Sequence, residues 1–139
     1  MASRPRSAQP AALPTSTKRA RSPTRRGRHF EQLAEAFLHE RGLVTLARNH
    51  RCRGGELDLV MHDGISVVFV EVRYRRTDRF GGARASIDRR KQARLVHAAE
   101  NFLAVYPDYV NSPCRFDVIA MGGDANAPSY DWIAGAFSA

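Results

Sequence analysis

The stretch GGELDLVMHDGISVVFVEVRYR, residues 54–75, decides the fold of this 139-residue chain. Its two apolar runs flank the dipeptide Asp63-Gly64, which is typical of a tight β-hairpin. A two-residue loop at this dipeptide sets Asp58 opposite Phe69, because pairing proceeds outward from the turn one residue at a time. The sequence therefore predicts antiparallel strands over about 55–62 and 65–74.

Charged side chains recur along this hairpin at even spacing. Side chains alternate across a strand, so the predicted pairing places four of them on one face of the sheet: Glu56, Asp58, Glu71 and Arg73. Asp58 and Glu71 are then diagonal neighbours, roughly 7–8 Å apart at their Cα atoms. The prediction depends on an even loop length, because a three-residue loop would turn Asp58 to the opposite face.

Two carboxylates side by side on an apolar hairpin repel each other, and burial increases the cost. A divalent cation removes this repulsion, and a few hard oxygen ligands with open coordination positions suit Mg²⁺ or Mn²⁺. The hairpin therefore predicts a metal site at Asp58 and Glu71. The alternative is an exposed sheet face on which Glu71 and Arg73 form ordinary ion pairs.

The composition, with 43% hydrophobic and 26% charged residues, is typical of a soluble globular domain. No apolar run approaches the ~20 residues that span a bilayer, and the first residues lack the apolar centre of a secretory signal. Cys52 and Cys114 have no further Cys or His at metal-binding spacing. These features predict a cytoplasmic protein, in a reducing compartment, that does not enter the membrane.

The formal charge of +8 comes from the N-terminal part of the chain. Residues 1–28 contain eight basic residues and no acidic one, among many Pro, Ser, Thr and Ala residues, which predicts a disordered basic tail. The remaining 14 basic and 14 acidic residues balance within the folded domain, 29–139. Nine of those basic residues lie between Arg73 and Arg94 with only two acidic ones, a local net charge of +7.

This basic segment predicts contact with a polyanion, DNA or RNA, beside the carboxylates. The alternative is a solvated loop and helix end. The candidate nucleic-acid-binding residues are Arg75, Arg76, Arg79, Arg84, Arg89, Arg90, Lys91 and Arg94.

Two helices are predicted, over about 30–41 and 87–106, from apolar residues at intervals of three and four. Glu31 lies at the rim of the first apolar face, where it either reaches toward the sheet or complements the helix dipole. Ser86 is the expected N-cap of the second helix. Lys91 falls within the apolar stripe of that helix, so it either extends to the surface or points toward the edge of the sheet.

Three more strands are predicted, over 43–50, 113–121 and 129–133. Asp117 is interpreted as an edge carboxylate or as a partner of a neighbouring strand, and Trp132 as a packing residue. The order of helix, three strands, helix and two strands predicts an α/β fold with a mixed sheet flanked by helices.

Six segments, in this order, resemble a known family: FEQLAEAFLHERGL (30–43), RNHRCRGGELDLVMHDG (48–64), VVFVEVRYR (67–75), RKQARL (90–95), CRFDVIAM (114–121) and DWIAGAF (131–137). They look like the YraN-type family of small bacterial proteins and cover about residues 29–138. That family resembles the restriction-endonuclease-like fold, whose PD-(D/E)xK nucleases include archaeal Holliday-junction resolvases. The resemblance implies an αβββαβ core and Mg²⁺-dependent cleavage of DNA phosphodiesters by metal-activated water, with branched DNA as a candidate substrate.

The resemblance also implies roles for single residues. Asp58 and Glu71 correspond to the metal-binding acids, Glu31 to the helical acid that completes the metal site, and Gln92 to a polar position of the following helix. Arg73 stands where the family pattern usually has a lysine. Arginine keeps its proton, so Arg73 cannot act as a general base, although it can stabilise charge on a phosphate.

Two further expectations come with this fold. A catalytically silent module that binds nucleic acid or recruits a partner is the alternative to a nuclease, because fold does not imply activity. Many relatives of the fold act as dimers, so a homodimer is a further expectation.

Overall fold

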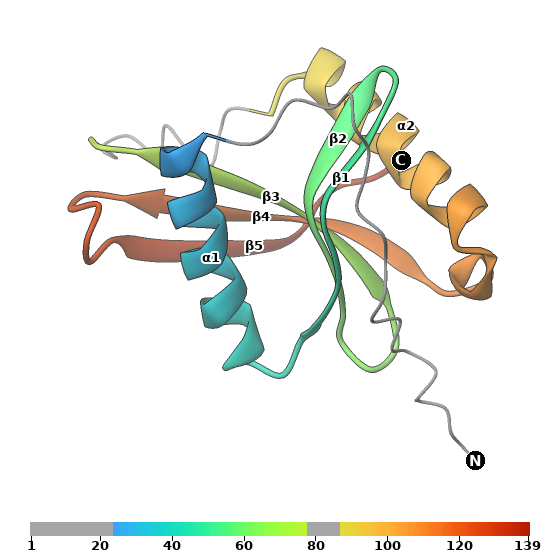
Figure 1. Ribbon diagram of the computed structural model, residues 1–139, viewed down its shortest axis with the longest axis horizontal. Coiled ribbons are helices and arrows are strands. Elements are labelled where there is room, and N and C mark those ends of the chain that lie inside the picture. The colour runs from blue at the N-terminus through green and yellow to red at the C-terminus, as the bar shows by residue number, and fades with distance from the viewer. Residues whose placement is uncertain (1–23, 78–86) are drawn as a thin grey trace.

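Two α-helices, one short 3₁₀ helix and five strands make up residues 24–77 and 87–139, the part of the chain that the computed structural model describes (Figure 1). In chain order they are α1 (Arg25–His39), β1 (Val44–Cys52), β2 (Gly55–His62), β3 (Val67–Arg75), α2 (Arg89–Val105), η3 (Pro107–Tyr109), β4 (Cys114–Gly122) and β5 (Ser129–Phe137). This order confirms the predicted helix, three strands, helix and two strands. The expected tail up to residue 23 lies outside the described residues.

The five strands form one sheet in the order β1-β2-β3-β4-β5. Neighbouring strands are antiparallel except β3 and β4, which run parallel. A parallel pair needs a crossover connection, and α2 lies in that connection. The sheet is therefore mixed, and the αβββαβ core is confirmed.

Apolar clusters lie against both helices. α1 buries Phe30, Ala34 and Leu38, spaced one turn apart, and these pack on β2, β3 and β4 residues such as Met61 and Ile119. The other cluster joins the buried face of α2 to β1, β2, β3 and β4; from α2 it contains Leu95, Ala98, Ala99 and Phe102. In Figure 1, α1 crosses β3, β4 and β5, whereas α2 lies beside the β1–β2 hairpin. The N-terminal part of each helix lies beside β3, with Phe30 of α1 against Tyr74 and Lys91 of α2 against Glu71.

The turn between β2 and β3 contains four residues, 63–66, where the sequence predicted two. The Asp63 carboxylate accepts hydrogen bonds from the backbone N–H groups of Ile65 and Ser66, at 2.9 and 2.7 Å. Asp63 N–H in turn donates to the carbonyl of Ser66 at 3.1 Å. An aspartate that bonds the backbone two and three residues ahead thus holds the wider turn.

The wider turn moves the register of the hairpin by two residues. His62 pairs with Val67 and Val60 with Phe69, so the predicted pairing of Asp58 with Phe69 is wrong. A shift by an even number leaves Asp58 and Glu71 beside each other, as predicted. Strict alternation along β2 is interrupted at this point, because Leu57 belongs to the α2 cluster and Leu59 to the α1 cluster. Continuing the observed register by one residue beyond its last pair, Leu59 with Val70, brings Asp58 directly opposite Glu71.

The N-termini of both helices differ from the prediction. α1 begins at Arg25, within the segment assigned to the tail, because Thr24 accepts a hydrogen bond from Gly27 N–H at 2.8 Å. α2 is capped by Asp88, which accepts from Lys91 N–H at 2.8 Å, so the expected cap at Ser86 is wrong. The last strand extends to Phe137 instead of ending at residue 133.

Candidate active site at a fork in the sheet

The sheet divides at the point where the acidic residues stand. Pairing between β2 and β3 ends at Leu59 and Val70. Beyond that pair, β2 stays with β1 and β3 stays with β4, and Figure 1 shows the β1–β2 hairpin rising away from β3. Asp58 and Glu71 are the first residues past the last pair. Two carboxylates therefore face the gap in which the backbone ladder is interrupted.

Side-chain hydrogen bonds replace the missing ladder. Asp58 Oδ2 accepts from the backbone N–H of Val72 at 2.8 Å, across the fork. Glu31, from α1, lies close enough to Asp58 to affect its pKa and accepts a hydrogen bond from Asn49 Nδ2 at 2.9 Å. The three predicted acids therefore meet in one place, although they come from three different elements.

Asn49 is a site residue that the sequence analysis missed. It lies in β1 between Arg48 and His50, both of which pair with β2, and so stands opposite Asp58 in the register. Its φ of 47° makes it the only non-glycine residue with positive φ in 24–77 and 87–139. Asparagine tolerates this left-handed conformation better than most residues. An asparagine inside a strand pattern was the available signal, and its contact with Glu31 gives it a role.

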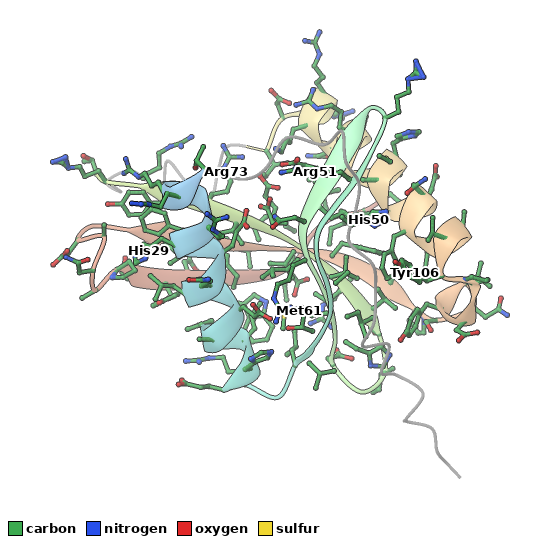
Figure 2. All side chains as sticks on the ribbon, in the orientation of Figure 1. His29, His50, Arg51, Met61, Arg73 and Tyr106 are labelled. Carbon is green, nitrogen blue, oxygen red and sulfur yellow. The ribbon has the colours of Figure 1, made fainter. Side chains whose placement is uncertain are left out.

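Two cations flank the Glu71 carboxylate, which is only 7% exposed. Lys91 Nζ, from α2, lies 3.3 Å from Glu71 Oε2, and Arg73 Nη1 lies 4.0 Å from the same atom. Lys91 therefore points toward the sheet, which decides between its two predicted orientations. Figure 2 shows Arg73 toward the N-terminal end of α1, with Arg51 on the β1–β2 side of the fork. Burial raises the pKa of Glu71, although the charges of Lys91 and Arg73 oppose the shift.

Asp58 has a different environment. Its contacts in the described part of the chain are a backbone N–H and other carboxyl groups, and it has no ion-pair partner there. Burial first, and then the negative charges of Glu71 and Glu31, raise the pKa of Asp58 well above its ordinary value. Burial also raises the pKa of Glu31, and the hydrogen bond from Asn49 offsets part of that shift. Negative charge is therefore in excess on the β2 side of the fork.

Two adjoining pockets open at the fork, each of about 400 Å³, and they share Glu71, Val72 and Tyr74. The first pocket lies between α1 and the acids and is lined by Thr24, Arg26, Gly27, Phe30, Glu31, Asp58, Glu71, Val72 and Tyr74. The second lies at the start of α2 and is lined mainly by basic side chains, Arg73, Arg75, Arg90, Lys91 and Arg94, with Asp88. Acidic and basic walls thus meet at Glu71.

The remaining predicted residues fall in three groups. Gln92 donates through Nε2 to the carbonyl of Ile87 at 3.0 Å, and it lines neither of these pockets. Arg76 and Arg89 are exposed beside the second pocket. Arg79 and Arg84 lie outside the described residues. The predicted basic surface is therefore brought to the acids at Arg75, Arg90, Lys91 and Arg94.

The donor set at the fork suits a magnesium-like cation with few protein ligands. In residues 24–77 and 87–139, no group of three or more His, Cys, Asp or Glu side chains is arranged to hold a metal ion. Mg²⁺ needs fewer protein ligands than three, because it keeps several waters and takes one or two carboxylates together with substrate phosphates. Asp58, Glu71 and the carbonyl of Val72 supply such oxygen atoms, and the unpaired charge of Asp58 would be neutralised.

Asp117 and Trp132 lie away from the fork. Asp117 is 1% exposed and accepts hydrogen bonds from Arg115 Nε at 3.0 Å, Trp132 Nε1 at 2.9 Å and Gly135 N–H at 2.9 Å. It therefore ties β4 to β5, the neighbouring strand, and Trp132 packs against Phe37 with its ring centroid 6.5 Å away. Both residues serve the fold.

These features define a class: a small α/β domain whose mixed sheet carries an acidic fork between a pocket at α1 and a basic pocket at α2. The model of the Uncharacterised protein family UPF0102 matches residues 30–121, and the chain belongs to this family, that of the YraN-type proteins. A UPF0102 protein of Pseudomonas putida (strain GB-1) is 56% identical over 119 residues, 85% of this chain and 97% of the relative. A UPF0102 protein of Xanthomonas axonopodis pv. citri (strain 306) is 54% identical over 114 residues, 82% of this chain and 92% of the relative.

The described helices carry one further finding. Neither α1 nor α2 is long and apolar enough to cross a membrane.

Proposed function

We propose that this protein is a metal-dependent endonuclease that hydrolyses phosphodiester bonds of nucleic acid at the fork. The observation that carries the proposal is the environment of Asp58. Its carboxylate lies near those of Glu71 and Glu31 and has no ion-pair partner among the described residues. Such an arrangement is unfavourable for folding alone, and a bound divalent cation would relieve it. Perturbed carboxylates in a pocket are typical of functional sites.

Each residue at the fork has a separate task in this proposal. Asp58 and Glu71 would hold the cation, and Glu31 would hold a water molecule beside it. Mg²⁺ or Mn²⁺, when bound, lowers the pKa of water and neutralises charge on the phosphate. Asn49 keeps the Glu31 carboxylate in position through its hydrogen bond of 2.9 Å.

The basic side of the fork receives the substrate. Arg73 and Lys91 lie within 4.0 Å of Glu71, so they also lie beside the position of the scissile phosphate and stabilise the charge that develops there. Arg75, Arg90 and Arg94 line the adjoining pocket and bind neighbouring phosphates. The αβββαβ core supports the proposal, since it is the core that the resemblance to the restriction-endonuclease-like fold implies.

The test is cleavage of labelled branched, flapped, single-stranded and duplex DNA, and of RNA, with Mg²⁺ and with Mn²⁺. Asp58→Asn and Glu71→Gln should abolish cleavage. Glu40→Gln is the matched control, because Glu40 is an exposed acid at the end of α1, pairs with Arg41 at 3.8 Å and lines neither pocket. It should cleave like the wild type. Cleavage that persists unchanged in Asp58→Asn would contradict the proposal.

A second function has one observation in its favour. Lys91 and Arg73 already neutralise Glu71 without a metal ion, as expected of a catalytically silent module that binds nucleic acid. Calorimetric titration with Mn²⁺ separates the two functions. A nuclease binds the ion and loses that binding in Asp58→Asn, whereas the silent module retains DNA in a salt-sensitive manner with or without the ion.

A further inference from the structure

The corner of the first pocket that faces α1 is built from aromatic rings, beside the acids. Phe30 and Tyr74 stack with centroids 4.0 Å apart and ring planes inclined by 12°. Phe30 is buried, while Tyr74 is only partly buried and turns its remaining surface to the pocket. The Tyr74 hydroxyl donates to the carbonyl of Gly123, which fixes the ring from the opposite end. The ring pair therefore offers a rigid apolar wall.

A guanidinium group stands at the rim of this wall. The Arg26 side chain is exposed, and its Cζ lies 5.4 Å from the Tyr74 centroid and 5.8 Å from that of Phe30. Both distances are within the range of cation–π attraction, so the rings hold the guanidinium at the pocket. Arg26 has no carboxylate partner among residues 24–77 and 87–139, which leaves its N–H groups available to a ligand.

The position of Arg26 relative to the acids determines what it can bind. The basic pocket lies toward α2 and the aromatic corner toward α1, with Glu71 in the lining of both. A phosphodiester chain held by Arg75, Arg90 and Arg94 and passing over the acids would reach Arg26 next. Cations on both sides of an acidic centre suit a chain that continues beyond the reacting phosphate.

We propose that this corner binds an unpaired nucleotide adjacent to the scissile phosphate, with Arg26 on its phosphate and the Tyr74 ring against its base. The proposal rests on the proposed function and adds the form of the substrate. A base within a duplex is paired and stacked on both faces, so it cannot lie against Tyr74. An unpaired base can, because aromatic side chains stack on single-stranded bases of any identity. The pocket, at about 400 Å³, falls within the ~300–1,000 Å³ of small-ligand sites.

The test measures binding without catalysis. Fluorescence anisotropy on the full chain, in EDTA, compares a single-stranded oligonucleotide with the blunt duplex of the same sequence. Arg26→Ala should weaken single-strand binding about tenfold and lower the slope of log affinity against log salt by about 0.7, the value for one phosphate contact on a single strand. Arg25→Ala is the matched control, since Arg25 is an exposed arginine one residue earlier that does not line the pocket. It should change both quantities much less.

A second pair of variants tests the ring. Tyr74→Leu should weaken single-strand binding about tenfold, the order of one base–aromatic stack, and leave duplex binding nearly unchanged. Tyr74→Phe keeps the ring and should bind like the wild type. Equal losses in Arg26→Ala and Arg25→Ala, or equal losses on single strand and duplex, overturn the inference but leave the nuclease proposal standing. A wild type that binds no nucleic acid in EDTA also overturns the inference, while the cleavage assay still decides the nuclease proposal.

Discussion

Replacing Gly55 by alanine tests how closely α2 is fitted to the sheet that carries the acids. Gly55 begins β2, and its backbone conformation is open to any residue. A Cβ atom there would lie 2.4 Å from the carbonyl oxygen of Arg94 and 3.3 Å from the Cβ of Ala98, both in α2. Ordinary contact begins at 3.4 Å, so the helix must move by about 1 Å, because a backbone oxygen in mid-helix cannot turn aside.

The expected cost combines two opposing terms. Overpacking a well-filled contact costs about 1–3 kcal/mol. Alanine also reduces the freedom of the unfolded chain, which returns about 0.4–1 kcal/mol. The net loss should be about 1–2 kcal/mol in the free energy of unfolding, or a fall in Tm of roughly 3–10 °C for a domain of this size. Because Lys91 lies one turn before Arg94, the same movement separates Lys91 from Glu71.

Urea unfolding followed by circular dichroism measures the loss, and native-state hydrogen exchange locates it. Gly64→Ala serves as the control, since Gly64 has a φ of 100° and open space around it. Its cost is backbone strain confined to the turn, so it should leave the exchange of α2 amides unchanged. Gly55→Ala should accelerate exchange throughout α2. An unfolding free energy equal to or above that of the wild type would refute the close approach of α2 to β2.

Three further predictions concern polar residues. Asp58→Asn should be about 1–2 kcal/mol more stable than the wild type at pH 7 by urea unfolding. The folded-state pKa of Asp58 is raised, so the free energy of unfolding of the wild type falls as pH rises above about 4. Below that pH the unfolding free energies of the two proteins should become equal. Asn49→Ala should lose about 1–3 kcal/mol through its left-handed φ and the lost bond to Glu31, whereas Asn49→Gly should lose less, and equal losses would contradict a backbone contribution. Asp117→Ala should lose about 2–4 kcal/mol in urea midpoint analysis, since Trp132 Nε1 and Gly135 N–H lose their acceptor while Arg115 keeps its ion pair with Asp63 at 2.7 Å; a loss below 1 kcal/mol would contradict this.

Local pattern was sufficient to predict that Asp58 and Glu71 come together. Asp63-Gly64 was interpreted as a two-residue turn, but the turn contains four residues. The Asp63 side chain accepts hydrogen bonds from the N–H groups of Ile65 and Ser66, and these bonds hold the wider turn. The prediction that Asp58 lies beside Glu71 was unaffected, since side chains in a β-strand repeat every two residues and the register differs by two. Helix and strand order followed from periodicity in the same way.

Contacts between distant segments account for what the sequence left undecided. Lys91 had two orientations by its place on the helix, and only the packing of α2 beside β3 selects the one toward Glu71. Asn49 looked like an ordinary strand residue, because its left-handed φ and its bond to Glu31 depend on where α1 lies. The fork itself has no local pattern, since it arises where β2 follows β1 and β3 follows β4.

The apolar core supplies the stability that a small domain needs in order to tolerate an unfavourable group of acids at the fork. Two large apolar clusters, one against each helix, hold the sheet, and none of the three acids belongs to either cluster. At the fork, backbone hydrogen bonds between β2 and β3 are missing and like charges lie close together. Both features lower the free energy of unfolding. A structural role alone would favour neutral residues at Asp58 and Glu31. Removing the charge of Asp58 should therefore stabilise the fold and disable the site, an opposition that packing or solubility roles for Asp58 do not produce.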